Sequence, residues 1–195
     1  CGKAALAGGN LGPPALELLD QPVPDFYVLE LSSYQLETTT SLVTASAAVL
    51  NVTPDHMDRY DSVAEYAAAK AHVLDGAATA VINLDDEIVR AMPRPGQRVL
   101  GFSLERVADF SVRDRDHDPV LLRRGRPLVA MSELRIAGLH NAANALAAFA
   151  MLEAMELPAE QGLDALKRFA GLPHRSQWVA DAAGVRYVDD SKGTN

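Results

Sequence analysis

The chain has 195 residues, of which 48% are hydrophobic, and a formal net charge of −8 at pH 7. This length allows one large domain, or one domain and part of another, with ample apolar residues for a core. The acidic balance argues against a nucleic-acid partner or an anionic membrane surface, although a small phosphorylated ligand needs only a few local cations. The single cysteine, Cys1, excludes an intrachain disulfide framework. No apolar stretch approaches the roughly 20 residues of a membrane span and no signal peptide is visible, so we expect a cytoplasmic protein without membrane insertion.

Apolar runs and helical periodicity alternate through the first half of the chain. A strand opens the sequence, a short helix with proline in its first turn is predicted over residues 13–19, and a longer helix over residues 62–78. Apolar runs without alternation predict the buried strands of a parallel sheet. This succession predicts an α/β fold with a doubly wound, mostly parallel sheet. The buried strands are predicted over residues 25–31, 45–52, 79–84 and 97–103, with a short helix over residues 85–92.

The second half begins with a different pattern. Alternating segments between residues 109 and 138 turn at Arg124-Gly125-Arg126 and predict a small antiparallel patch. Residues 140–155 predict a helix that is apolar almost all round and therefore buried. A glycine and a proline within residues 171–175 predict a domain boundary. Beyond the long helix, the sequence predicts a helix over residues 158–169 and a hairpin over residues 176–191 that turns at Ala183-Gly184.

Glu30 interrupts a predicted strand near its carboxyl end, where α/β sheets bind ligands. The alternative is an edge-strand glutamate that faces water. Apolar residues on both faces of the strand disfavour this alternative, and a buried glutamate needs a partner. Ser32 and Ser33 follow, and their hydroxyls either bind phosphate or cap a helix, of which capping is the more common role.

His56 lies in the segment NVTPDHMDRY, just after the next predicted strand, and should reach the same edge of a parallel sheet as Glu30. A glutamate with a neutral imidazole suits a divalent ion, although histidine is not the usual magnesium ligand. The alternative is structural, because Thr53-Pro54 is typical of a helix start and Asp55 would favour its first turn. The two interpretations are compatible. We expect His56 to serve the site, and Asp55 and Asp58 to serve the local structure.

Lys70 occupies the centre of a helical stripe that is otherwise apolar, formed with Val63, Ala67, Leu74 and Ala77. One interpretation is a lysine whose aliphatic stem follows the edge of the stripe while its ammonium reaches water. The other is a lysine held in a cleft, with a lowered pKa and special chemistry.

Two further groups of polar residues suit a nucleotide. Asn141 and Asn144 share a face at the start of the buried helix, where a carboxamide either caps the helix or reads a base edge. An apolar strand delivers Asp190 and Lys192, which suit a ribose hydroxyl and a phosphate, although a polar turn explains them equally well. No G-x-x-x-x-G-K-[ST] phosphate loop occurs in the chain.

Several motifs together resemble those of one family. In chain order they are GGNLGPPAL, ELSSYQLET, NVTPDHMDRY, YAAAK, GLHNAANALAA, GLPHRSQ and VDDSKGTN. They span the whole chain and are similar to the Mur ligase family. The combination of SSYQLET with DHMDRY resembles the members that add D-glutamate. The resemblance implies the P-loop NTPase-like fold of a Mur ligase central domain.

This resemblance implies an ATP-dependent amide ligase of peptidoglycan synthesis. ATP would phosphorylate the carboxylate of UDP-N-acetylmuramoyl-L-alanine, and the amine of D-glutamate would attack the acyl phosphate. Residues 1–171 would form the central ATPase domain, and residues 172–195 a linker and the first hairpin of a C-terminal domain. An N-terminal domain, the phosphate loop and most of the C-terminal domain would lie outside the chain, so the chain alone is expected to be inactive.

The same resemblance implies roles for individual residues. Glu30 resembles a glutamate that binds Mg²⁺, and His56 resembles a histidine that binds a second Mg²⁺ beside the acyl phosphate. Lys70 resembles a lysine that is carbamylated, a change that turns a cation into a carboxylate-like metal ligand. The other residues resemble contacts to the substrates: Asn141 and Asn144 to adenine, Asp190 to the ribose, Arg175 and Lys192 to the phosphates of ATP, and Asn10, Ser32 and Gln35 to the UDP-muramoyl substrate.

Two other functions stay open on the sequence. One is a sibling Mur ligase that adds a different amino acid, because the domain that selects the amino acid would lie beyond the chain. The other is a non-catalytic nucleotide- or partner-binding module derived from a ligase. A parent reading frame with a phosphate loop upstream and a further domain downstream would exclude the module.

Overall fold

The computed structural model of the chain describes residues 2–192, with every side chain in that range except that of Arg186. Cys1 and the last residues of the motif VDDSKGTN therefore lie outside the described part. The described residues form a six-stranded sheet and two two-stranded sheets. The predicted α/β class with a mostly parallel sheet is confirmed.

The largest sheet has the strand order β3-β4-β5-β6-β7-β8. The pairs from β3 to β6 are parallel, and the pairs from β6 to β8 are antiparallel. The predicted antiparallel patch therefore exists, and it continues the parallel sheet through the pairing of Phe102 with Phe110. The strands are β3 (Thr44–Val49), β4 (Ala77–Asn83), β5 (Arg98–Phe102), β6 (Phe110–Arg113), β7 (Val120–Arg123) and β8 (Arg126–Ala130).

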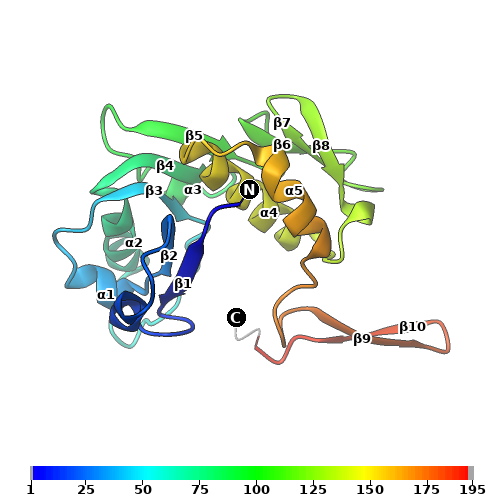
Figure 1. Ribbon diagram of the computed structural model, residues 1–195, viewed down its shortest axis with the longest axis horizontal. Helices are drawn as coiled ribbons and strands as arrows, with labels where there is room; N and C mark the ends of the chain where they lie inside the picture. Colours follow the sequence, from blue (N-terminus) through cyan, green and yellow to red (C-terminus); the bar gives the residue numbers. More distant parts are fainter. Residues whose placement is uncertain (1, 193–195) are drawn as a thin grey trace.

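Helices cover both faces of this sheet, as a doubly wound fold requires (Figure 1). Within β4, Val81 packs toward α4 (Leu139–Ala154), while Ala80 and Ile82 pack toward α2 (Val63–Ala71). Successive side chains point to opposite faces of a strand, so a strand that is apolar throughout serves two cores. Among the described residues, none of the helices has the length and apolarity that a bilayer crossing demands. The other helices in these layers are η2 (His72–Leu74), α3 (Glu87–Arg90) and α5 (Ala159–Arg168).

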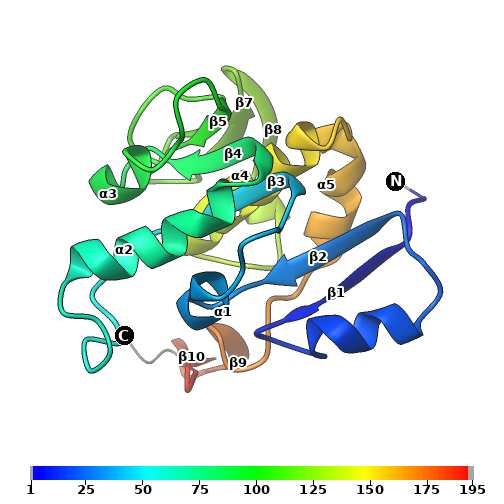
Figure 2. The ribbon, with the colours of Figure 1, turned by 90° about the vertical axis from the view of Figure 1, so that its left-hand side faces the viewer.

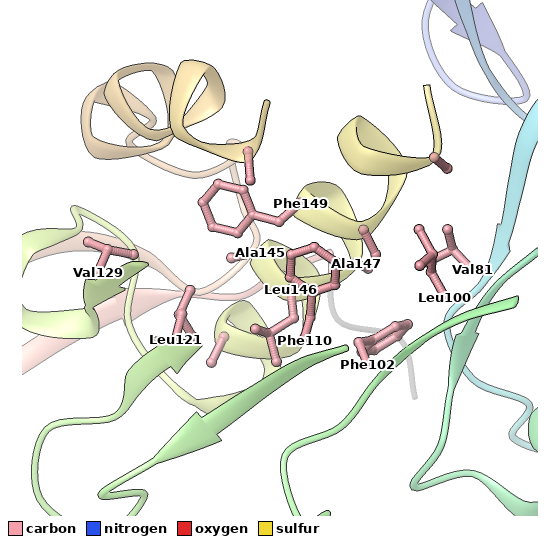
Figure 3. Packing of buried hydrophobic residues seen from close by; sticks show 14 of the residues in the cluster. Val81, Leu100, Phe102, Phe110, Leu121, Val129, Ala145, Leu146, Ala147 and Phe149 are labelled. Carbon is pink, nitrogen blue, oxygen red and sulfur yellow. The ribbon is translucent and has the colours of Figure 1, made fainter. Parts of the chain in front are cut away.

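α4 lies at the centre of the larger core (Figure 3). Leu146 is fully buried and Phe149 is 2% exposed. Figure 3 shows Leu146 pointing toward the strands that carry Phe110 and Leu121. Small side chains elsewhere on α4 let the helix lie close to the sheet; they are Ala142, Ala145, Ala147, Ala150 and Ala154.

The first two strands form a separate parallel sheet, which corrects one prediction. Within the described residues β2 (Phe26–Glu30) pairs only with β1 (Ala5–Gly9), and the 3-10 helix η1 (Ala15–Asp20) stands in place of the helix predicted over residues 13–19. Tyr27 and Val28 stay 41% and 49% exposed. The expectation that this strand is buried on both faces is therefore wrong here, since no layer of described residues covers it. Figure 2 shows the pair lying outside the large sheet and its helices.

The C-terminal hairpin is confirmed in position and turn. β9 (Gln177–Ala182) and β10 (Val185–Asp189) are antiparallel. Ala183 and Gly184 connect them with φ of 51° and 76°, the positive values that two-residue hairpin turns need. Figure 1 shows this hairpin extending away from the large sheet.

Two element ends differ from the predictions. The helix predicted over residues 62–78 ends at Leu74, and β4 begins at Ala77. Gly76 permits this sharp passage, because a Cβ atom there would lie 1.9 Å from the carbonyl oxygen of Leu42. The alternation predicted up to residue 138 stops at β8, and the 3-10 helix η3 (Met131–Glu133) follows.

An ion-pair network fixes the last turn of α4 to β7. Both oxygens of Glu153 accept hydrogen bonds, from Nε of Arg123 and from Nη2 of Arg124, each at 2.6 Å. The Glu153 side chain is only 11% exposed. Burial by itself raises the pKa of Glu153, but the hydrogen bonds from Arg124 and Arg123 outweigh it and hold the pKa below the ordinary 4.5. The ionised carboxylate therefore stabilises the folded state.

We expect Glu153→Gln to lower the free energy of unfolding at pH 7 by about 2 kcal/mol, a typical value for hydrogen bonds to a charged group. Because the folded-state pKa is lowered, the stabilisation is present above pH 4.5 and is lost as the pH falls through the folded pKa. Urea denaturation at pH 7 and at about pH 4 would show a smaller difference at the lower pH.

Glu87→Gln is the matched control, since that side chain is 84% exposed and lies 3.7 Å from Arg90. Its effect should stay within about 0.5 kcal/mol at both pH values. An equal loss for Glu153→Gln at pH 7 and pH 4 would show that charge is not the source of the stabilisation.

Candidate functional site

The carboxyl ends of β1 and β2 bring Asn10 and Glu30 together. Nδ2 of Asn10 donates to Oε1 of Glu30 at 3.3 Å, and its backbone N–H donates to the Glu30 carbonyl at 2.7 Å. Gly9 makes this approach possible: its φ is 114°, and a Cβ atom would lie 2.3 Å from the Glu30 carbonyl oxygen. The Glu30 residue is exposed, so its carboxylate is accessible to a ligand.

Ser32 and Gln35 cap the helix α1 (Ser33–Glu37). The Ser32 hydroxyl accepts from the Gln35 N–H at 3.3 Å, and the Gln35 side chain accepts from the Ser32 N–H at 2.9 Å. This reciprocal capping box satisfies two backbone donors at the helix start. The structure therefore shows Ser32 in the capping role. Ser32 and Gln35 are only half-buried, so they can still border a ligand.

The His56 backbone has a left-handed conformation, with φ of 55°. Oδ1 of Asp55 accepts from the His56 N–H at 2.8 Å, a local structural role for this aspartate. The His56 carbonyl accepts from the N–H groups of Arg59 and Tyr60, at 2.9 and 3.1 Å. The prediction that a helix begins at Thr53-Pro54 is wrong. His56 has a left-handed backbone, which a right-handed helix cannot include, and only a single turn follows it. Residues 56–60 are called the His56 turn below.

His56 and Lys70 both contact the ring of Tyr66. The imidazole of His56 lies 6.1 Å from the ring of Tyr66, and Nζ of Lys70 lies 4.9 Å from the same ring centroid. Tyr66 and Lys70 are one helical turn apart on α2, whose start is capped by Ser62. Lys70 is half-buried, and no carboxylate of a described residue lies within ion-pair distance of it.

α1 connects this pair of residues to Glu30. It begins directly after β2, and the ring of Tyr34 on α1 lies 5.2 Å from the His56 imidazole. Among the described residues, no hydrogen bond or ion pair joins the Glu30 side chain to His56 or Lys70. The ring contacts therefore connect His56 to α1 through Tyr34 and to Lys70 through Tyr66, without a closed cluster that includes Glu30.

A cavity of about 660 Å³ lies between the N-terminal end of α4 and the segment that leads into β9. Asn141 and Arg175, both predicted site residues, line it, as does the aromatic side chain of Trp178. Nδ2 of Asn141 donates to the Ala137 carbonyl at 2.7 Å, which leaves its amide oxygen free of that bond. Trp178 was not predicted as a site residue, since nothing in an exposed hairpin strand marks one aromatic residue as part of a cavity wall.

Three arginines, Arg115, Arg135 and Arg175, are among the residues that line this cavity, together with one acidic residue, Asp118. Nη1 of Arg115 lies 3.4 Å from a carboxylate oxygen of Glu105, so part of this positive charge is already paired. Asp118 accepts from the N–H and the hydroxyl of Ser132, at 3.0 and 2.6 Å. The excess of arginine over acidic residues in the lining favours an anionic ligand.

The remaining predicted nucleotide residues lie around this cavity rather than in its lining. Oδ1 of Asp190 accepts from the N–H of Ser176, which does line the cavity, at 2.8 Å. The Lys192 N–H donates to the His174 carbonyl at 3.0 Å. Asn144 is exposed on the next turn of α4 and is not among the lining residues.

The carboxylate of Asp189 joins the residues just before and just after the hairpin. Asp189 accepts from the Ser191 N–H at 3.0 Å and lies 2.7 Å from Nδ1 of His174. These two hydrogen bonds, the Ser191 bond first, lower the pKa of Asp189 to about 2. The start and the end of the hairpin are thereby tied together beside the cavity.

The sequence matches the family described as the Mur ligase middle domain over residues 13–152. A UDP-N-acetylmuramoylalanine–D-glutamate ligase from Nitrosococcus oceani is 50% identical over 196 residues, which cover 100% of this chain and 43% of that protein. The corresponding ligase from Methylococcus capsulatus is 48% identical and is covered to 42% of its length. The chain thus spans less than half the length of these relatives.

Solved structures show the same architecture. A MurF ligase from Thermotoga maritima, in complex with ADP, superposes with a TM-score of 0.76 at 18% identity, over 97% of this chain and 47% of that one. A UDP-N-acetylmuramoyl-L-alanyl-D-glutamate–2,6-diaminopimelate ligase superposes with a TM-score of 0.67 at 26% identity, over 80% and 35% of the two chains. At 18% identity, the likeness to the MurF ligase shows a shared fold and nothing more. The family match over most of the chain shows that this protein belongs to the Mur ligase family.

Proposed function

We propose that the chain is part of an ATP-dependent ligase that joins D-glutamate to UDP-N-acetylmuramoyl-L-alanine in peptidoglycan synthesis. The observation that carries this proposal is the 50% identity, along the whole chain, with a ligase of that name. Residues 1–171 would form the central ATPase domain, and residues 172–195 the linker and first hairpin of the next domain. The end of α5 at Arg168 and the start of β9 at Gln177 support a boundary between them.

The cationic cavity supports a nucleotide site. Helix N-termini and guanidinium groups favour phosphate, and the N-terminal end of α4 and Arg175 both border the cavity. Asn141 would read the adenine edge, and Trp178 offers a face on which a base can stack. We propose that Asn144, Asp190 and Lys192, just outside the lining, complete the adenine, ribose and phosphate contacts when the hairpin closes on ATP.

The candidate metal residues fit Mg²⁺ together with oxygens of the substrates. Within residues 2–192, no group of three or more His, Cys, Asp and Glu side chains could hold a metal ion. Mg²⁺ usually binds one or two carboxylates plus phosphate oxygens and water, and the exposed Glu30 carboxylate fits that pattern. Glu30 would hold one Mg²⁺, and His56 with a carbamylated Lys70 would hold a second; both ions would neutralise charge on the transferred phosphate.

The residues of this chain would act mainly by positioning. The γ-phosphate of ATP passes to the substrate carboxylate, ADP leaves, and the D-glutamate amine then displaces phosphate from the acyl phosphate to form the amide. His56, held in one backbone conformation, would present its imidazole to the acyl phosphate. Asn10, bonded to Glu30, and the Ser32 and Gln35 pair would border the UDP-muramoyl substrate. Catalysis of phosphoryl transfer rests largely on such positioning and on charge stabilisation.

The test is a ligase assay with the full-length protein that carries this chain. Given ATP, Mg²⁺ and UDP-N-acetylmuramoyl-L-alanine, it should release ADP with D-glutamate and not with L-lysine or meso-diaminopimelate. Arg175→Ala should raise the KM for ATP by about tenfold, as expected for loss of one charge-assisted contact. ADP release with another amino acid would identify a sibling ligase, and no release with any of them would refute the proposal.

A further inference from the structure

Glu37, the last residue of α1, bonds two side chains of the His56 turn. Oε2 of Glu37 accepts from Nη2 of Arg59, and Oε1 accepts from the hydroxyl of Tyr60. Tyr60 is 4% exposed, so one end of this arrangement is buried. The hydrogen bonds from Arg59 and Tyr60 lower the pKa of Glu37, which keeps the carboxylate ionised at neutral pH.

The same two residues hold the His56 backbone. Arg59 and Tyr60 donate their N–H groups to the His56 carbonyl, while their side chains donate to Glu37. A left-handed conformation at a residue other than glycine is unfavourable and persists only where neighbours hold it. Glu37 therefore bonds the two residues whose N–H groups hold the strained backbone of His56.

A second contact from α1 reinforces the first. Tyr34 lies on the same face of α1 as Glu37, three residues earlier. Its ring stacks on that of Tyr60 at 6.3 Å and an interplanar angle of 9°, and the Arg59 guanidinium lies 5.1 Å from it. The ring also lies 5.2 Å from the imidazole of His56. α1 thus contacts the His56 turn through a carboxylate and through a ring.

We propose that Glu37 is a positioning residue that fixes the His56 imidazole at the ends of the parallel strands. Glu37, Arg59 and Tyr60 are called the Glu37 clasp. The inference rests on the proposed function, because it assigns the clasp a purpose only if His56 serves the reaction. An exposed ion pair alone contributes little, but here a buried tyrosine shares the carboxylate. The clasp also links the helix that follows Glu30 to the turn that carries His56.

The test compares kcat, KM and melting temperature of the full-length ligase and its variants. A carboxamide offers one acceptor oxygen where the carboxylate offers two, so Glu37→Gln can accept from only one of its two partners and loses the charge that pairs with Arg59. We expect kcat to fall by about tenfold, since small misplacements of catalytic groups cost up to on the order of a hundredfold. The KM for ATP should stay within about a factor of two, because the nucleotide cavity is separate. Tyr60→Phe should also lower kcat, because it removes the hydrogen bond from the Tyr60 hydroxyl to Glu37.

Glu133→Gln is the matched control, because Glu133 also pairs with a cation, Lys167 at 2.6 Å, on an exposed surface. Its kcat should not change. The double variant Glu37→Arg with Arg59→Glu keeps opposite charges at the two positions, so it should recover kcat relative to Glu37→Arg alone. If Glu37→Gln loses thermal stability, Tyr60→Phe decides the matter, because it keeps the ion pair and removes one hydrogen bond of the clasp: a lower kcat at an unchanged melting temperature supports the clasp, and a wild-type kcat overturns it.

The outcome also separates this inference from the proposed function. If His56→Ala keeps the wild-type kcat, the role of His56 and the clasp fail together. If His56→Ala loses activity while Glu37→Gln and Tyr60→Phe keep it, only the clasp is refuted.

Discussion

The His56→Ala variant of the full-length protein is expected to lose at least about a hundredfold in kcat, the range in which positioned acid–base and electrostatic groups act. The imidazole is 43% exposed and lies at the ends of the parallel strands beside Tyr34 and Tyr66. Its ring contact with the buried Tyr66 is edge-on at 6.1 Å between centroids, so most of the loss should appear in turnover. The melting temperature should move by no more than about 3 °C. Steady-state kinetics and thermal unfolding on the same preparations would measure both quantities.

His72→Ala is the matched control for this variant. The His72 side chain is 49% exposed, follows α2 directly, and lies 2.9 Å from Asp75. It contacts a carboxylate, as His56 does, but its side chain has no hydrogen bond, ion pair or ring contact with Glu30, His56 or Lys70 among the described residues. Its kcat should stay within about twofold of the wild type. Equal losses in the two variants would show that the effect is general and not specific to His56.

Leu146→Ala should give the largest loss of stability, about 3 kcal/mol, the lower part of the range for leucine deletions in a packed core. Leu146 is 0% exposed, and it lies in the cluster formed by α4 and the sheet. Its neighbours belong to a helix and to strands of one sheet, so the cavity cannot close without moving a whole element. Urea denaturation would show a lower midpoint with an unchanged slope.

Leu16→Ala gives the corresponding change where no core is present. Leu16 lies in η1 and is 79% exposed. Its removal should change the free energy of unfolding by less than about 0.5 kcal/mol. A loss for Leu146→Ala no larger than this would show that α4 is not packed as the structure describes.

Periodicity alone predicted the elements whose partners lie inside the chain. β4 is apolar at successive positions, and both of its faces are in fact buried, against α2 and α4. The apolar character of α4 likewise matches its position between the sheet and α5. The same reasoning failed for β2, which is equally apolar but exposed, because an apolar pattern shows that a face can be buried and not which element covers it.

The site shows the same division between local and distant information. Spacing along the predicted helix placed Lys70 on an otherwise apolar stripe, and two motifs singled out Asn141 and Arg175, which line one cavity in the structure. The local pattern at Thr53-Pro54 predicted a helix that does not form. The His56 turn forms in place of that helix, and its side chains Arg59 and Tyr60 bond Glu37 on α1.

By itself, the sequence determined the α/β class, the position of most strands and helices, and the family resemblance, because these depend on local periodicity and on short motifs. Only the tertiary structure decided which strand is exposed, that Asn10 bonds Glu30, that Asn141 and Arg175 line one cavity, and that Glu37 bonds two side chains of the His56 turn. The physical reason is that these contacts join residues far apart in the chain. Such contacts depend on how the sheet edges and helices are stacked, and no pattern along a single segment encodes that arrangement.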